Sequence, residues 1–143
     1  MAGVVVGTDG SSNALRALRW AVDEARMRGT GLTVLAVVPV PVTLAQIGRP
    51  LVGQPEAADV RAAETSAKEA VAEVGADDVE VAVRVVAGVP AEELINASAD
   101  ADLLVVGSRG GGGFSRLLLG SVSSQIVHHT RCPVTVVPEA GRA

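Results

Sequence analysis

Glycine and serine are concentrated in one stretch of the chain, GSRGGGGFSRLLLGSVSS, which begins at Gly107 and ends at Ser124. The stretch directly follows an apolar run, 103–106, and this position is typical of a loop that leaves a buried strand. Glycine lets the main chain approach a ligand closely, and successive exposed N–H groups form a concavity that binds anions. The residue types and their position therefore predict a site for a phosphate group.

The end of the same stretch, GSVSS at 120–124, is predicted to begin a helix. Free N–H groups and a partial positive charge at a helix N-terminus favour a phosphate. The serine hydroxyls add hydrogen-bond donors, and Arg109 and Arg116 carry charge that can pair with phosphate oxygens. In the alternative interpretation, the glycines are only a flexible turn and Ser121 is only a helix cap.

A second candidate loop, GTDGS at 7–11, follows the first apolar run, 4–6. In open α/β sheets, ligands bind beyond the carboxyl ends of the strands, where the strand order reverses. If the strands at 4–6 and 103–106 are neighbours, both loops face one crevice. Asp9 has no second acid, histidine or lysine placed to complete a catalytic set, so we assign no catalytic residue and favour a binding role.

Other common sites for phosphates and metals do not fit the sequence. The only lysine, Lys68, lies in a predicted helix far from any Gly-rich loop, which excludes a Walker-type loop. The dinucleotide fingerprint Gly-x-Gly-x-x-Gly is missing, because the first strand-turn-helix has GTDGSS instead. The adjacent His128 and His129 point about 100° apart on a helix. A shared metal site is therefore not expected.

Length and composition predict one domain over residues 1–143 with a core of small and β-branched side chains. Hydrophobic residues make up 48% of the chain, its net charge is −4 and its pI is about 5.1. The acidic balance argues against nucleic-acid binding. No apolar run approaches the roughly 20 residues that cross a bilayer, and the first residues lack a basic signal-peptide region. We therefore expect no membrane association and a cytoplasmic location, which the lone Cys132 also fits.

Strands and helices alternate along the chain. Apolar runs and an alternating edge segment predict strands at 4–6, 32–38, 79–86, 103–106 and 133–137. Helical spacing predicts helices at about 12–28, 56–74, 91–100 and 121–129. Residues 39–55, rich in Pro and Gly, are interpreted as a long loop. The order predicts an α/β fold, in which a parallel sheet has helices on both faces.

These segments together resemble the universal stress protein family. The spacing Gly107-x2-Gly110-x9-Gly120-Ser121 matches the family's ATP-binding signature. The resemblance covers nearly the whole chain and includes VVVGTDGS, VLAVV, GVP at 88–90, LLVVGSRG, LLLGSVS and CPVTVV. It implies an open five-stranded parallel sheet, order 3-2-1-4-5, of the Rossmann-like, adenine nucleotide α-hydrolase-like type. In that order the first and fourth strands are side by side.

The family resemblance also implies which residues hold the nucleotide. Asp9 and Val37 match positions beside the adenine ring, largely through main-chain contacts, and Gly7 lines the same floor. Gly107 matches a position near the ribose, and Gly110 and the turn at 120–123 match phosphate contacts. The predicted cofactor-binding residues are Gly7, Thr8, Asp9, Val37, Gly107, Arg109, Gly110, Gly120, Ser121, Val122 and Ser123.

The family resemblance implies an ATP-binding stress-response protein in which nucleotide occupancy, with Mg²⁺, regulates shape or partner choice. We expect no catalytic activity beyond slow ATP hydrolysis. Two alternatives stay open: an adenine-nucleotide hydrolase-type enzyme, weakened by the GTDGSS turn, and a nucleotide-free dimeric interaction module. The apolar strand from Pro133 to Val137 is expected at a sheet edge, where it can pair with another chain, so we expect a homodimer.

Overall fold

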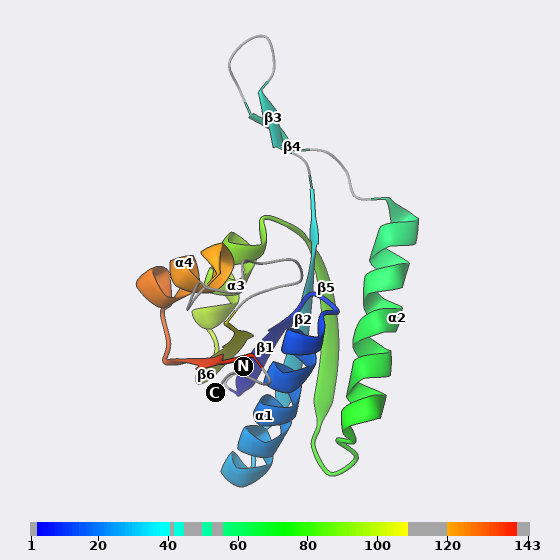
Figure 1. Ribbon diagram of the computed structural model, residues 1–143, viewed down its shortest axis with the longest axis vertical. Helices are drawn as coiled ribbons and strands as arrows, with labels where there is room; N and C mark the ends of the chain where they lie inside the picture. The colour runs from blue at the N-terminus through cyan, green and yellow to red at the C-terminus, as the bar shows by residue number, and fades with distance from the viewer. Residues whose placement is uncertain (1–2, 41, 45–49, 53–55, 109–119, 140–143) are drawn as a thin grey trace.

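The computed structural model describes residues 3–40, 42–44, 50–52, 56–108 and 120–139. Five parallel strands form one sheet in the order β5-β2-β1-β6-β7, with helices on both of its faces (Figure 1). The strands are β1 (Val4–Thr8), β2 (Leu32–Pro39), β5 (Val81–Gly88), β6 (Leu103–Gly107) and β7 (Val134–Val137). Counted among these five strands, the order is 3-2-1-4-5, which confirms the expected fold.

Two apolar clusters hold the helices against the two faces of the sheet. The helices are α1 (Ser12–Arg28), α2 (Ala57–Val74), α3 (Pro90–Ser98) and α4 (Ser121–His129). Side chains of α1 and α2 share one cluster, and those of α3 and α4 share the other. In β6, Leu103 and Val105 belong to the first cluster and Leu104 to the second, because successive side chains of a strand point to opposite faces. Within the described ranges, no helix is both long and apolar enough to cross a bilayer.

The ends of the two long helices match the local sequence signals. The Ser11 side chain accepts a hydrogen bond from the Ala14 N–H at 3.1 Å and caps the start of α1. Gly29 follows α1 with a φ of 66°, and Gly75 follows α2 with a φ of 79°. Glycine adopts these positive φ values without the steric penalty that a Cβ atom imposes.

The prediction that residues 39–55 form one long loop is wrong in part. Pro39 ends β2, and two further strands, β3 (Val42–Leu44) and β4 (Pro50–Val52), pair antiparallel with each other. The pair projects beyond the carboxyl end of the sheet (Figure 1). Strands of three residues are too short to show an alternating pattern, and a proline at the first position of a strand is compatible with pairing. The sequence therefore gave no clear signal for this hairpin.

Candidate functional site

The candidate site lies where β1 and β6 end side by side. Val4, Val5 and Val6 are in register with Leu103, Leu104 and Val105 of the neighbouring parallel strand. The loops that follow both strands therefore leave the sheet at the same edge. This confirms the adjacency that a shared crevice requires, and it is also the point at which the strand order reverses.

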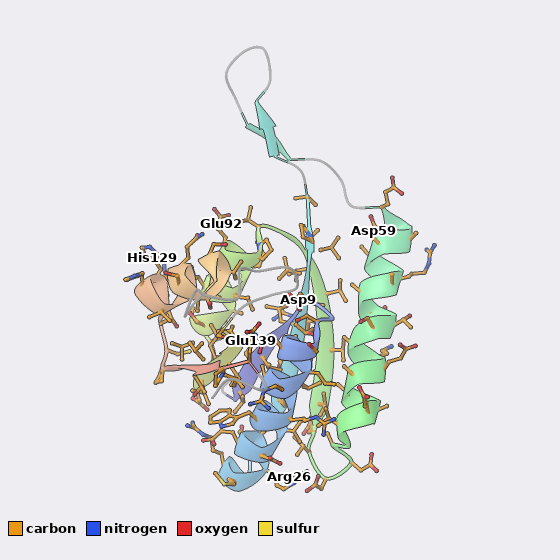
Figure 2. All side chains as sticks on the ribbon, viewed as in Figure 1. Asp9, Arg26, Asp59, Glu92, His129 and Glu139 are labelled. Carbon is orange, nitrogen blue, oxygen red and sulfur yellow. The ribbon has the colours of Figure 1, made fainter. Side chains whose placement is uncertain are left out.

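The turn between β1 and α1 is held by its own side chains. Asp9 Oδ1 accepts a hydrogen bond from the Ser11 N–H at 2.9 Å, and Thr8 Oγ1 accepts one from the Gly10 N–H at 3.3 Å. Gly10 has a φ of 81°, which favours glycine there. Figure 2 shows Asp9 at this end of the sheet, beside the start of α1. The Asp9 carboxylate thus stabilises the turn through this hydrogen bond, as aspartate commonly does in turns.

The N-terminus of α4 is hydrogen-bonded to the end of β6. The Ser108 carbonyl accepts hydrogen bonds from the Gly120 N–H at 2.6 Å and from Ser123 Oγ at 2.7 Å. Ser108 also donates its own N–H to the Val137 carbonyl at 2.8 Å, which ties the same point to β7. Residues 108 and 120, which flank the glycine-rich segment, therefore lie in direct contact.

The cap of α4 is Gly120, so the interpretation of Ser121 as a helix cap is wrong. Gly120 has a φ of −75° and no side chain that could accept from the first N–H groups of the helix. Those groups have no partner within a helix, and they are the donors that bind anions at helix N-termini. Ser121 and Val122 are exposed, whereas Ser123 is buried with its hydroxyl directed at Ser108.

Val37 lies in β2 just beyond the end of β1. The last residue pair of these strands is Thr8 with Ala36, and the Val4 N–H donates to the Gly31 carbonyl. Because main-chain groups alternate in direction along a parallel ladder, those of Val37 point toward β1. Its carbonyl consequently faces the space past Thr8, while its half-buried side chain packs with the α3 and α4 cluster.

Two glycines at this edge are covered by helices. A Cβ atom on Gly7 would lie 2.9 Å from Leu94 Cδ2 of α3, and one on Gly107 would lie 2.7 Å from Asn13 Nδ2 of α1. Each distance is too short for a real contact, so a Cβ atom at either position would displace the facing side chain of the helix. The sequence predicted that both glycines contact a ligand. It did not indicate the side chains that face them, because Asn13 belongs to no motif and Leu94 fits an ordinary core position of a helix.

Comparison with known proteins identifies the family. The model of the universal stress protein family matches residues 2–138. The chain belongs to this family. A universal stress protein of Mycobacterium tuberculosis is 37% identical over 150 residues, which cover 94% of this chain and 47% of that relative. The chain therefore spans about half the length of the curated relatives that it matches.

Solved structures of universal stress proteins share the fold. One in complex with cAMP has a TM-score of 0.69 and 29% identity, with 95% of each chain covered. Another, from Archaeoglobus fulgidus in complex with dAMP, has a TM-score of 0.68 and 21% identity, with 96% of this chain and 98% of that chain covered. The ligands of these two universal stress proteins are both adenine nucleotides.

Two of the predicted site residues lie outside the described residues: Gly110, which the family resemblance implies, and Arg109, which is predicted only from its charge. Arg116, predicted from its charge as well, also lies outside them. In the part of the chain that the structure describes, no group of three or more His, Cys, Asp or Glu side chains could hold a metal ion. The rings of His128 and His129 are 6.5 Å apart on exposed positions of α4. Every other predicted site residue lies at or directly after the carboxyl end of β1, β2 or β6, or in the cap and first turn of α4.

Proposed function

We propose that this chain binds an adenine nucleotide, ATP, at the carboxyl edge of the sheet between β1 and β6. The observation that carries the proposal is the attachment of the α4 N-terminus to the end of β6 through Ser108. It brings helix N–H groups that have no acceptor within the helix to the edge at which ligands of this fold class bind. The adenine nucleotides bound by two solved family members support the same ligand class.

The adenine ring is proposed to lie over the ends of β1 and β2. The Val37 carbonyl faces the space past Thr8 and is a suitable acceptor for an exocyclic amino group. The turn at Gly7, Thr8 and Asp9 would form the floor and contribute main-chain contacts. This arrangement needs no particular side chain at Val37, because the contact would come from its main chain.

The phosphates are proposed to lie at the start of α4, with the ribose beside Gly107. The contacts would come from Gly110 and from the main chain of residues 120–123, and the charge of Arg109 would add to them. Gly120 fits this role because it has no side chain that could cap the helix N–H groups. Because the described part of the site lacks an acidic cluster, Mg²⁺ would be held mainly by the phosphates themselves.

The biological role that we propose is regulatory. Nucleotide occupancy in the cytoplasm would change the shape or the partner of a stress-response protein, with slow hydrolysis at most. A hydrolase-type enzyme is disfavoured by the GTDGSS turn at the end of β1. A homodimer through the strand at 133–137 is proposed as well, because β7 is an edge strand of the sheet.

The binding test begins with the nucleotide that copurifies with the protein. The protein is purified, denatured and its released nucleotide identified, and ATP is then titrated calorimetrically against the stripped protein. Alanine readily adopts the φ of −75° at Gly120, so Gly120→Ala adds a Cβ atom at the phosphate site without backbone strain. We expect it to weaken ATP binding by at least tenfold, about 1.4 kcal/mol. Gly31→Ala, at the other end of the sheet, is the matched control.

Undiminished ATP binding by Gly120→Ala would contradict the phosphate site. Turnover of ATP at a rate of about 1 per second or faster would favour the hydrolase alternative, because that is the range of ordinary enzymes.

A further inference from the structure

Ser123 is the most deeply buried serine at the candidate site. Its residue is 3% exposed, although it lies in the first turn of a helix whose neighbouring positions Ser121 and Val122 are exposed. Its hydroxyl donates to the Ser108 carbonyl at 2.7 Å and lies 3.3 Å from the Gly120 carbonyl. A hydroxyl has one proton, so the shorter contact takes the hydrogen bond.

Ser108 is the point at which three elements meet. Its residue is 6% exposed, and its carbonyl uses both lone pairs, one for the Gly120 N–H and one for Ser123 Oγ. Its N–H donates to Val137 of β7. The start of α4 is thus connected to the sheet by two hydrogen bonds to one buried oxygen atom, and only one of the two comes from a side chain.

We infer that the Ser123 hydroxyl is a positioning group of the phosphate site, which acts through the Ser108 carbonyl and not by its own contact with the phosphates. The inference rests on the proposed nucleotide site. The Ser123 hydroxyl holds the first turn of α4 at the end of β6, so that the N–H groups of the helix stay directed at the ligand. A polar group placed by a buried hydrogen bond keeps its orientation, and misplacement by about 1 Å is enough to lose a large part of a binding interaction.

The test compares two ligands that differ only in their phosphates. Ser123→Ala is expected to weaken ATP binding about tenfold while adenosine binding stays within about twofold, since a lost buried hydrogen bond is worth about that much. Hydrogen exchange in the nucleotide-free protein separates positioning from direct contact. The amides of Gly120 and Ser124, which are bonded to Ser108 and to Gly120, should exchange faster in Ser123→Ala before any ligand is added.

Ser98 provides a matched control. It lies at the end of α3 and is 0% exposed. Its hydroxyl donates a hydrogen bond to the Ile95 carbonyl at 2.6 Å and accepts one from the Arg131 N–H at 2.9 Å. Ser98 precedes β6, at the opposite end of the sheet from the candidate site. Ser98→Ala therefore removes a buried serine hydroxyl of the same kind, and we expect it to leave the ratio of ATP to adenosine affinity unchanged.

The outcomes separate the two proposals. If the unmodified protein does not bind ATP, the proposed function fails and the positioning role falls with it. If the unmodified protein prefers ATP to adenosine and Ser123→Ala keeps that ratio, only the positioning role is overturned. A lower ATP affinity with unchanged exchange at Gly120 would indicate direct contact and would also overturn it. Should Ser123→Ala fail to fold, Ser123→Thr and Ser123→Val give the same comparison, because they share one shape and only threonine keeps the donor.

Discussion

The side chain of Asn13 lies directly over Gly107, where a Cβ atom would be 2.7 Å from Asn13 Nδ2. The same Cβ atom would be 3.4 Å from the main-chain carbonyl oxygen of Asn13, so the helix backbone is close as well. Asn13 is 7% exposed in the first turn of α1. The glycine that the family resemblance places beside a ribose is therefore also the residue that lets α1 approach the sheet.

Gly107→Ala is expected to destabilise the protein by about 1–3 kcal/mol, the usual cost of extra volume in a packed interior. Urea unfolding followed by circular dichroism measures the change. Asn13→Ala removes the facing amide, so the double variant should be more stable than the sum of the two single changes predicts. If the two effects simply add, the contact with Asn13 is not the source of the loss.

Most of the fold was predictable because each element carries its own local signal. Apolar runs mark β1, β2 and β6, alternation marks the edge strand β5, and glycines follow α1 and α2 where the chain must adopt positive φ. The β3–β4 hairpin was missed because its strands have three residues each and one begins with proline. Periodicity needs a longer segment before it distinguishes a strand from a loop.

The candidate site was predictable in its location and less so in its contacts. The strand order and the two loops place it, and both follow from patterns in the sequence. Which partner a polar side chain chooses depends on atoms far apart in the chain. The Ser123 hydroxyl was expected to face a phosphate, but its partner is the Ser108 carbonyl, fifteen positions earlier. No local spacing indicates such a bond.

Asp9 offers a test of turn structure against ligand contact. Asp9→Ala loses the acceptor of the Ser11 N–H and should lower stability by about 1 kcal/mol. Asp9→Asn keeps a side-chain oxygen at the same position, so it should retain both stability and ATP binding if the contact with adenine is made by the main chain. Thermal unfolding and calorimetric titration measure the two effects. Loss of ATP binding in a fully stable Asp9→Asn would instead assign the carboxylate charge to the ligand.

The Arg26–Asp78 pair gives stability a dependence on pH. Arg26 Nε and Nη2 donate to the two Asp78 oxygens at 2.5 and 2.9 Å and connect α1 to the segment before β5. The hydrogen bond with Arg26 lowers the pKa of the Asp78 carboxyl below its usual value. A lowered folded-state pKa contributes stability above the unfolded-state pKa, and the contribution is lost as pH falls through the folded-state value.

Asp78→Asn should therefore lower the melting temperature slightly at pH 7, because the pair is exposed and screened by solvent. The difference from the unmodified protein should be smaller at pH 3, below the unfolded-state pKa, and should also shrink in high salt. Melting curves at pH 7 and pH 3, with and without salt, measure it. A difference that persists unchanged at pH 3 would mean that the carboxylate charge is not what stabilises this contact.

The free edge of β7 allows the proposed dimer to be tested without damage to the sheet. The carbonyls of Pro133 and Val137 accept from the N–H groups of Leu104 in β6 and of Ser108 directly after it. Since main-chain direction alternates along a strand, the polar groups of Val136 face away from β6. Val136→Pro removes an outward N–H that a second chain would need, while the bonds to β6 stay in place.

Val136→Pro is expected to convert the dimer to a monomer in sedimentation at micromolar concentration. The opposite edge supplies the control. The Leu32 N–H donates to the Glu80 carbonyl, so by the same alternation the polar groups of Val85 in β5 face away from β2. Val85→Pro should therefore leave the dimer intact. If Val85→Pro dissociates the dimer and Val136→Pro does not, the pairing edge is β5. If the unmodified protein is already a monomer, the β7 edge has no role in self-association at that concentration.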